Sequence, residues 1–177
     1  MHKVIDNTFL SAARGDIHCI DLLTITDSTY QIVVTPEVLD ENFVKHGDLT
    51  YAPYDGYMQS EEYKRLYDLL KRRNFWIGKG ELSSIVCSIY LTHMGIDNYI
   101  VTDDKDARRL IQTIHTNPEV SKILGFSPPE LKLAGTIGLI CRMRDKGIIS
   151  KAECALIKRD LKNSTFRASD ALFNKLG

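Results

Sequence analysis

Short runs of β-branched and aromatic residues alternate along the chain with longer segments whose apolar residues recur every three or four positions. The short runs predict strands, and the recurring apolar positions predict helices with one buried face. The predicted strands cover residues 4–5, 32–35, 99–102 and 131–134. The predicted helices cover residues 9–14, 36–43, 61–73, 81–91, 107–114 and 136–146. Two segments rich in turn-forming residues, 44–59 and 117–129, are interpreted as surface loops.

The alternation of strands and helices predicts an α/β fold, in which a parallel sheet of four or five strands carries helices on both faces. A length of 177 residues with 44% apolar composition is enough for one domain with its own core. We therefore expect a single domain over residues 1–177, with the C-terminal helical part, about 136–177, packed on the same core.

The cysteines and the first residues bear on the compartment. The four cysteines are scattered, without a CxxC pair or the spacing of zinc ligands, so we expect reduced thiols. The chain reaches Asp6 after only two apolar residues, and no run approaches the roughly 18 apolar residues of a membrane helix. These features predict a cytoplasmic protein without a secretion signal or a membrane span.

The formal net charge is zero, because 23 basic residues balance 23 acidic ones. The two parts of the chain differ, however. Residues 1–60 contain 9 acids and 3 bases, whereas residues 61–177 contain 14 acids and 20 bases. This asymmetry hints at a polyanionic partner. The neutrality of the whole chain therefore does not exclude a nucleic-acid partner.

Acidic side chains follow the predicted strands. Asp6 follows the first strand and Asp103 and Asp104 follow the third, so in a parallel sheet they face the same crevice. Glu41 lies on the short helix after the second strand, and Glu81 opens the next apolar helix. Two carboxylates about 4 Å apart repel each other by roughly 1–4 kcal/mol, so a cluster of them needs a cation. Oxygen ligands favour Mg²⁺ or Mn²⁺, and such ions activate water for attack on a phosphodiester.

Each acid also has a purely structural explanation. Asp6 and Asp104 precede predicted helices, where aspartate is a favoured N-cap residue. Glu81 in a first helical turn is favoured by the helix dipole alone, and Glu41 could simply face solvent. The residues by themselves leave both interpretations open.

Six short motifs, in chain order, resemble those of PIN-domain proteins, in a PIN-like branch related to the toxin ribonucleases of toxin–antitoxin pairs. In that family a strand ends in Asp before a small polar residue, a second strand leads through Pro to a helix with an acid, and Gly-Glu opens an apolar helix. The motifs are VIDNTFL at 4–10, VTPEVLDE at 34–41, GELSSI at 80–85, VTDDKDARR at 101–109, GTIGL at 135–139 and FRASD at 166–170. The resemblance covers nearly the whole chain.

The resemblance implies a PIN-like fold and a set of site residues. The catalytic, metal-binding quartet of the family is matched by Asp6, Glu41, Glu81 and Asp104. Supporting polar positions are matched by Asn7, Thr102 and Thr136. Asp103 competes with Asp104 as the metal ligand, because the doubled acid leaves the register open. Glu81 departs from the pattern of many PIN nucleases, which have Asp there, and its longer side chain shifts the expected metal position.

The implied activity is that of a Mg²⁺- or Mn²⁺-dependent endoribonuclease, in which metal-activated water attacks the phosphodiester and leaves a 5′-phosphate. The toxin branch further implies a protein antitoxin and a homodimer. Two rival hypotheses are a non-catalytic PIN-like module, which binds RNA or a protein with an idle acidic pocket, and an α/β regulatory domain that binds a small ligand.

Other polar and aromatic residues have two explanations each. Basic residues over 142–162 are interrupted by acids, and they fit either a solvated helix face or a surface for a nucleic-acid backbone or a protein partner. Tyr51, Tyr54 and Tyr57 either stack on bases or pack locally. Lys79, close to Glu81, either contacts a phosphate or is solvated.

Overall fold

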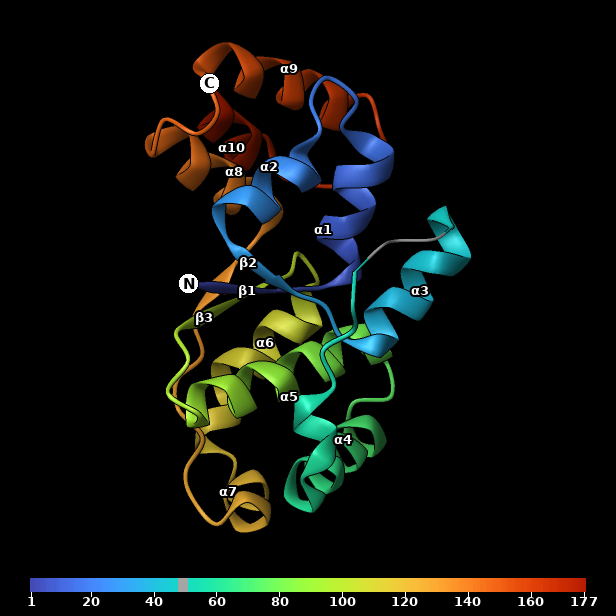
Figure 1. Ribbon diagram of the computed structural model, residues 1–177, viewed down its shortest axis with the longest axis vertical. Coiled ribbons are helices and arrows are strands. Elements are labelled where there is room, and N and C mark those ends of the chain that lie inside the picture. The colour runs from blue at the N-terminus through green and yellow to red at the C-terminus, as the bar shows by residue number, and fades with distance from the viewer. Residues whose placement is uncertain (48–50) are drawn as a thin grey trace.

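Four parallel strands form the central sheet of the computed structural model, which describes residues 1–47 and 51–177 (Figure 1). In the spatial order β2-β1-β3-β4 they are Gln31–Val33, His2–Ile5, Asn98–Val101 and Leu133–Ala134. All three pairings are parallel, and β1 is paired on both sides. The predicted α/β fold with a parallel sheet is confirmed, with four strands in the described residues.

The sheet has a topological switch point between β1 and β3. The chain passes from β1 to β2 on one side, and then returns across β1 to add β3 on the other side. Open α/β sheets bind ligands at such a point, beyond the carboxyl ends of the two strands. Asp6 directly follows β1, and its amide donates to the carbonyl of Val101 at the end of β3, at 3.2 Å. Two of the strand ends that carry predicted site acids are therefore neighbours.

Successive strand residues point to opposite faces of the sheet and enter two hydrophobic clusters. Ile5 and Val101 belong to the first cluster, and Val4 and Ile100 to the second. The first face, above the sheet in Figure 1, carries α1 (Asn7–Ser11), a π-helical turn (Ala12–Asp16), α2 (Leu22–Thr29), α8 (Thr136–Asp145) and α9 (Lys151–Lys162). The second face carries α4 (Glu61–Arg73), α5 (Lys79–His93), α6 (Lys105–Thr113) and α7 (Pro118–Leu124).

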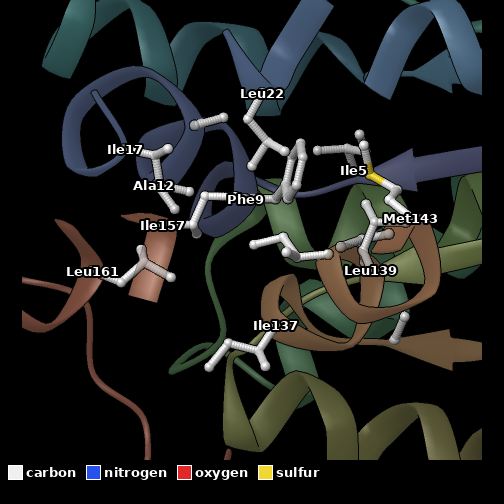
Figure 2. Packing of buried hydrophobic residues seen from close by; sticks show 14 of the residues in the cluster. Ile5, Phe9, Ala12, Ile17, Leu22, Ile137, Leu139, Met143, Ile157 and Leu161 are labelled. Atoms are coloured by element: carbon white, nitrogen blue, oxygen red, sulfur yellow. The ribbon is translucent and has the colours of Figure 1, made fainter. Parts of the chain in front are cut away.

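Figure 2 shows the first cluster at close range, with side chains of β1, α1, α2, α8 and α9 gathered together. Phe9 of α1 has no exposed surface, because it packs among these elements. Burying an aromatic or aliphatic side chain of this size contributes about 1.5–3 kcal/mol. The sequence segment directly after Asp6 is thus anchored by its own apolar residues.

The C-terminal residues belong to this same cluster. Phe166, Phe173 and Leu176 are buried against it. Phe166 precedes α10 (Asp170–Phe173), Phe173 is its last residue, and Leu176 ends a short 3₁₀ turn (Asn174–Leu176). Their burial fixes the basic residues between them next to α8, which matters for the cavity described below.

The described helices differ from the predicted ones mainly in the segments interpreted as loops. The segment 117–129 contains α7, because Asn117 caps it and Pro118 takes the first helical position, where proline needs no amide hydrogen. The helix predicted over 36–43 is α3 (Pro36–His46), so it enters the predicted loop 44–59. Residues 48–50 of that loop lie outside the described residues, and Gly56–Gln59 forms a 3₁₀ turn. The helix α2 was not predicted.

The helices are short. The longest described one, α5, has 15 residues, which at 1.5 Å per residue spans about 22 Å. The hydrocarbon core of a bilayer is about 30 Å thick. In the described part of the chain, no helix combines the length and the apolar composition that a membrane crossing requires.

Candidate functional site

Asp6 lies at the carboxyl end of β1, and none of its surface is exposed. Its Oδ1 accepts hydrogen bonds from the amides of Thr8 at 2.9 Å and Phe9 at 3.2 Å, which makes Asp6 the N-cap of α1. Its Oδ2 accepts the hydroxyl of Thr8 at 3.3 Å. The capping explanation therefore holds for this acid, but the cap uses only one carboxylate oxygen.

Thr102 joins Asp6 to the acids that follow β3. The buried hydroxyl of Thr102 accepts the amide hydrogen of Asp104 at 3.2 Å, and its interaction with Asp6 lowers the pKa of that carboxyl. Oδ1 of Asp104 accepts the amide of Ala107 at 2.7 Å, so Asp104 caps α6. One threonine thus holds together the strand ends that carry two of the predicted ligands.

Asp103 is turned toward the beginning of α8. Its two carboxylate oxygens lie 3.2 and 3.0 Å from the amide of Thr136, which donates to them. This contact replaces a local cap, because Gly135 at the N-cap position has no side chain to offer. Thr136, predicted as a supporting residue, thus meets an acid through its backbone. Its buried hydroxyl has no hydrogen-bond partner within the described residues.

The beginning of α5 is also capped from elsewhere in the chain. Gly78 occupies its N-cap position, and Oε1 of Glu41, on α3, accepts the amide of Gly80 at 2.9 Å. Glu41 is half-buried, so the alternative of a solvent-facing side chain is wrong. Glu81 is the third residue of α5, and its buried Oε2 lacks a hydrogen-bond partner in residues 1–47 and 51–177.

Glycines give three of these carboxylates room to approach the backbone. A Cβ atom on Gly80 would lie 2.6 Å from Oε2 of Glu41, and one on Gly78 would lie 2.1 Å from Oε2 of Glu81. A Cβ atom on Gly135 would likewise lie 2.4 Å from Oδ1 of Asp103. Any side chain at these positions would displace a carboxylate, so the placement of the acids depends on the glycines.

The acids border a cleft of about 380 Å³. The predicted site residues that line it are Asn7, Glu81, Asp103 and Asp104. Its other lining residues are Thr8, Ser11, Asp16, Thr165, Phe166 and Arg167. Four predicted residues do not line it, namely Asp6, Glu41, Thr102 and Thr136. The structure therefore brings the candidate acids to one end of the sheet, some on the cleft wall and others outside its lining.

Burial and mutual repulsion both act on the acids. Burial raises the pKa of Asp6 from its ordinary value of 3.8 to about 8, and the negative charges of Glu81 and Asp103 raise it further, against the hydrogen bonds from Thr102 and Phe9. Burial also raises the pKa of Glu81, and Glu41 and Asp104 add to this. The charged groups that act most strongly on these two carboxyls are thus other acids, and the site has an excess of negative charge.

The donor set has the chemistry of a magnesium or manganese site, but it is not closed around an ion. In the part of the chain that the structure describes, no three histidine, cysteine, aspartate or glutamate side chains are placed to hold a metal ion as they stand. Oxygens remain available, since Glu81 Oε2 has no partner and Asp104 caps α6 through Oδ1. The residues fit the ion by ligand type and by excess charge, and binding it requires some of these side chains to turn away from their caps.

Asn7 supports the first helix from the other side. Its Oδ1 accepts hydrogen bonds from the hydroxyl of Ser11 at 3.3 Å and from Nδ2 of Asn42 at 2.9 Å. Asn42 is buried on α3 and accepts Nη1 of Arg14 at 2.7 Å. This chain of bonds connects α1, which follows Asp6, with α3, which carries Glu41.

A second, larger cavity of about 620 Å³ lies beside the cleft, and apart from Asp103 none of its lining residues was predicted as a site residue. Basic side chains gather in it: Lys105, Arg108, Arg167 and Lys175. Lys105 and Arg108 follow Asp104 and are separated by about one helix turn, a pattern that is visible in the sequence. Arg167 and Lys175 show no such pattern, because only the folding of the C-terminal segment brings them to the cavity.

Two of the alternative sites receive no support from the structure. Tyr57 has no exposed surface and donates its hydroxyl to Glu37 at 3.1 Å, so it cannot stack on a base. Tyr54 is half-buried and lies against Tyr90, with ring centroids 6.5 Å apart. Lys79 is exposed at the first position of α5 and lines neither the cleft nor the larger cavity.

No family model, no curated protein and no solved structure matches this chain.

Proposed function

We propose that the chain is a PIN-domain protein that hydrolyses RNA with the help of Mg²⁺ or Mn²⁺. The observation that carries this proposal is the pairing of a fully buried acid, Asp6, with a second carboxylate, Glu81, whose buried Oε2 has no partner in the described residues. Crowding acids at a topological switch point costs stability unless a cation enters. Such a cost is expected where function requires the arrangement.

Asp6, Glu41, Glu81 and Asp104 are the proposed ligands. Bound Mg²⁺ or Mn²⁺ would supply a lower pKa for a coordinated water and positive charge against the phosphodiester oxygens. Asp104 is preferred to Asp103, because both oxygens of Asp103 face the amide of Thr136, whereas Asp104 caps its helix through one oxygen. Thr102 links the two acids, because its hydroxyl accepts the amide of Asp104 and its interaction with Asp6 lowers the pKa of that carboxyl.

The test is cleavage of single-stranded RNA by three proteins: wild type, Asp6→Asn and Asp40→Asn. Asn is itself a favoured N-cap residue, so Asp6→Asn keeps an acceptor for the amides of α1 while it removes the charge. Asp40 is an exposed acid on α3, and its replacement is the matched control. We expect cleavage by wild type and Asp40→Asn in Mn²⁺, and none by Asp6→Asn or by any of the three in EDTA.

A binding measurement accompanies the assay. Mn²⁺ should raise the melting temperature of wild type and of Asp40→Asn, and it should leave that of Asp6→Asn unchanged. Cleavage that survives both EDTA and Asp6→Asn would contradict the metal site, because no other cluster of acids described here lies at the strand ends.

A non-catalytic RNA- or protein-binding module is the second candidate function. The observation that favours it is that the acids already have structural work: Asp6, Asp103 and Asp104 each accept a backbone amide at the start of a helix. In this case wild type binds RNA or a protein but cleaves no RNA in Mn²⁺, and Mn²⁺ leaves its melting temperature unchanged.

Protein partners, an antitoxin or a second copy of the chain, are part of the same proposal. Exposed apolar side chains support it: Phe75 is 81% exposed and Trp76 is 59% exposed, in the loop between α4 and α5. Their rings contact each other edge to face, with centroids 5.1 Å apart. Light scattering of wild type and of a Phe75→Ser, Trp76→Ser variant tests the homodimer, which the substitutions should dissociate.

A further inference from the structure

The larger cavity beside the acidic cleft has the opposite charge. Lys105, Arg108, Arg167 and Lys175 line it, and Asp103 is its only acidic lining residue. The rest of its lining is small or apolar, with Gly135, the N-cap of α8, and Gly138 of α8 forming part of the wall. A Cβ atom on Gly138 would meet nothing within 4 Å, so this part of the wall is open.

The basic side chains of this cavity lack acidic partners. Seven ion pairs occur among the described residues, and none of them includes Lys105, Arg108, Arg167 or Lys175. Four basic residues and one acid leave the lining with an excess of positive charge, so the basic side chains repel each other and each gains from an anion placed between them. The cavity is therefore charged for an anionic ligand.

Backbone carbonyls hold the two arginines in place. Nη1 of Arg108 donates to the carbonyl of Thr102 at 2.9 Å, and Nη1 of Arg167 donates to the carbonyls of Ser164 and Phe166 at 3.3 and 3.4 Å. Guanidinium groups carry five N–H donors in a fixed plane, so these bonds orient each fork and leave further donors for a ligand. Planar forks of this kind match the oxygens of a phosphate.

The cavity and the acidic cleft are adjacent. Asp103 and Arg167 line both of them, so a ligand in one extends directly into the other. A single-stranded nucleic acid fits such a pair of adjacent sites, because each phosphate requires a cation and the sugars and bases between phosphates tolerate apolar walls. Ile137 and Leu172 supply such walls in the basic cavity.

We propose that the basic cavity binds a phosphate group of a single-stranded nucleic acid whose neighbouring phosphodiester lies at the acidic cleft. Lys105, at the start of α6, and Lys175, near the C-terminus, contribute positive charge. Arg108 and Arg167 donate hydrogen bonds to the phosphate. This deepens the proposed function and rests on it for the identity of the strand, while the binding itself requires no cleavage and no metal.

The experiment measures the affinity of a fluorescent single-stranded RNA by anisotropy, in EDTA so that no metal-dependent cleavage occurs. The test variant is Lys105→Gln, Lys175→Gln, because neither ammonium group is hydrogen-bonded to the described residues and both are exposed. The matched control is Lys71→Gln, Lys122→Gln, which removes the same charge from two exposed lysines on α4 and α7 that do not line the cavity. All three proteins should have the same melting temperature.

The test variant should bind RNA about tenfold more weakly than wild type, and the control within about twofold of it. The slope of log affinity against log salt should fall by about 0.7 in the test variant, since the cavity holds one phosphate and each phosphate contact to a single strand contributes about 0.7. Equal losses in the two variants, or no loss in either, would overturn the proposal. Competition by a polyglutamate peptide as strong as that by unlabelled RNA would overturn it as well.

Two RNA ends distinguish the source of the phosphate. If a 5′-phosphate tightens binding to wild type but not to the test variant, the cavity takes the terminal phosphate. Equal binding of 5′-phosphorylated and 5′-hydroxyl RNA, with the same loss in the test variant, assigns an internal phosphodiester instead. Either result supports the cavity.

The failures of the two proposals are separable. Binding that depends on Lys105 and Lys175, together with no cleavage by wild type in Mn²⁺, would leave the cavity standing and remove the nuclease. Cleavage that requires Asp6, together with equal affinities of the two lysine variants, would support the nuclease and overturn the phosphate site in the cavity.

Discussion

The two ends of β1 present the same electrostatic problem with opposite signs. At the carboxyl end, the buried Asp6 faces other acids, and at the amino end the almost fully buried Lys3 faces other bases. Burial lowers the pKa of Lys3 from 10.5 to about 8, and the charges of Arg142, Lys146 and Lys132 lower it as well, against the attraction of Asp97. One four-residue strand thus has an acidic and a basic pole.

The basic pole is neutralised from within the chain. The ammonium of Lys3 lies 4.0 Å from the ring centroid of Tyr99 and 4.8 Å from that of Tyr30. Tyr99 also contacts Arg142 and Lys132, at 4.7 and 5.3 Å, and Lys132 pairs with Asp97. Aromatic faces and an acid therefore stand in for counter-ions. At the acidic pole the carboxylates accept backbone amides, and Arg167 is the one basic residue among those described that lines their cleft, which is why we expect a cation from solution there and not at the other end.

The largest expected effect concerns pH, measured as the free energy of unfolding in EDTA. The pKa of Asp6 is about 8 when folded and near 3.8 when unfolded, so the unfolded chain binds fewer protons between pH 4 and 8, and stability falls as the pH rises through this window. For Lys3 the folded pKa is about 8 and the unfolded value 10.5, so the unfolded chain binds more protons and stability rises between pH 8 and 10.5.

Two variants separate these opposite slopes. Asp6→Asn should flatten the fall between pH 4 and 8, and Lys3→Met should flatten the rise above pH 8. Urea denaturation across the pH range measures both. Burial also raises the pKa of Glu81, so a smaller fall should remain in Asp6→Asn. A wild-type stability that does not change between pH 4 and 8, or a fall as large in Asp6→Asn as in wild type, would show that the burial of Asp6 does not lower the stability of the charged form.

The second prediction isolates the cap at the acidic pole. At pH 6 the carboxyl of Asp6 is mainly protonated, so the charge drops out of the comparison. Asp6→Ala leaves the amides of Thr8 and Phe9 without their acceptor, and we expect it to cost about 2–4 kcal/mol. Asp6→Asn keeps the acceptor and should match wild type. Equal losses in both variants would mean that the cap is not what Asp6 contributes at this pH.

The third and smallest effect is at the basic pole. Tyr99→Leu removes the ring that three cations contact, and we expect a loss of about 1.5 kcal/mol at pH 7, since exposed cation–π contacts contribute about 0.5–1 kcal/mol each. Tyr99→Phe keeps the ring and should be close to wild type. Thermal and urea unfolding of the pair measure the difference, and a Tyr99→Leu protein as stable as the Phe variant would contradict internal neutralisation.

The sequence was a good guide wherever a local pattern determines the structure. β-Branched runs located the strands, and the acids directly after β1 and β3 lie side by side because parallel strands end at the same edge. The loop interpretation of 117–129 was wrong where α7 lies. The three prolines of this segment were given more weight than Asn117, which caps the helix. The fourth strand is also shorter than predicted, with only Leu133 and Ala134 paired.

Contacts between distant segments could not be derived in the same way. Glu41 is held by the amide of Gly80, and no pattern within α3 indicates that α5 begins beside it without a cap of its own. Arg167 and Lys175 reach the basic cavity because Phe166, Phe173 and Leu176 are buried. The basic residues of α8 and α9 likewise divide between uses that only the fold reveals, because some stack on tyrosines and others pair with acids.

The glycines beside the carboxylates have a consequence for how such a site is mapped. Substitution by alanine removes atoms at Asp6 or Glu81, whereas at a glycine it adds them, so the glycine positions test how much room the carboxylates need. At Gly78, Gly80 and Gly135 the informative change adds a single methyl group, which leaves every charge in the molecule unaltered. A scan that adds a methyl group at these three glycines therefore tests the part of the site's shape that depends on absent side chains.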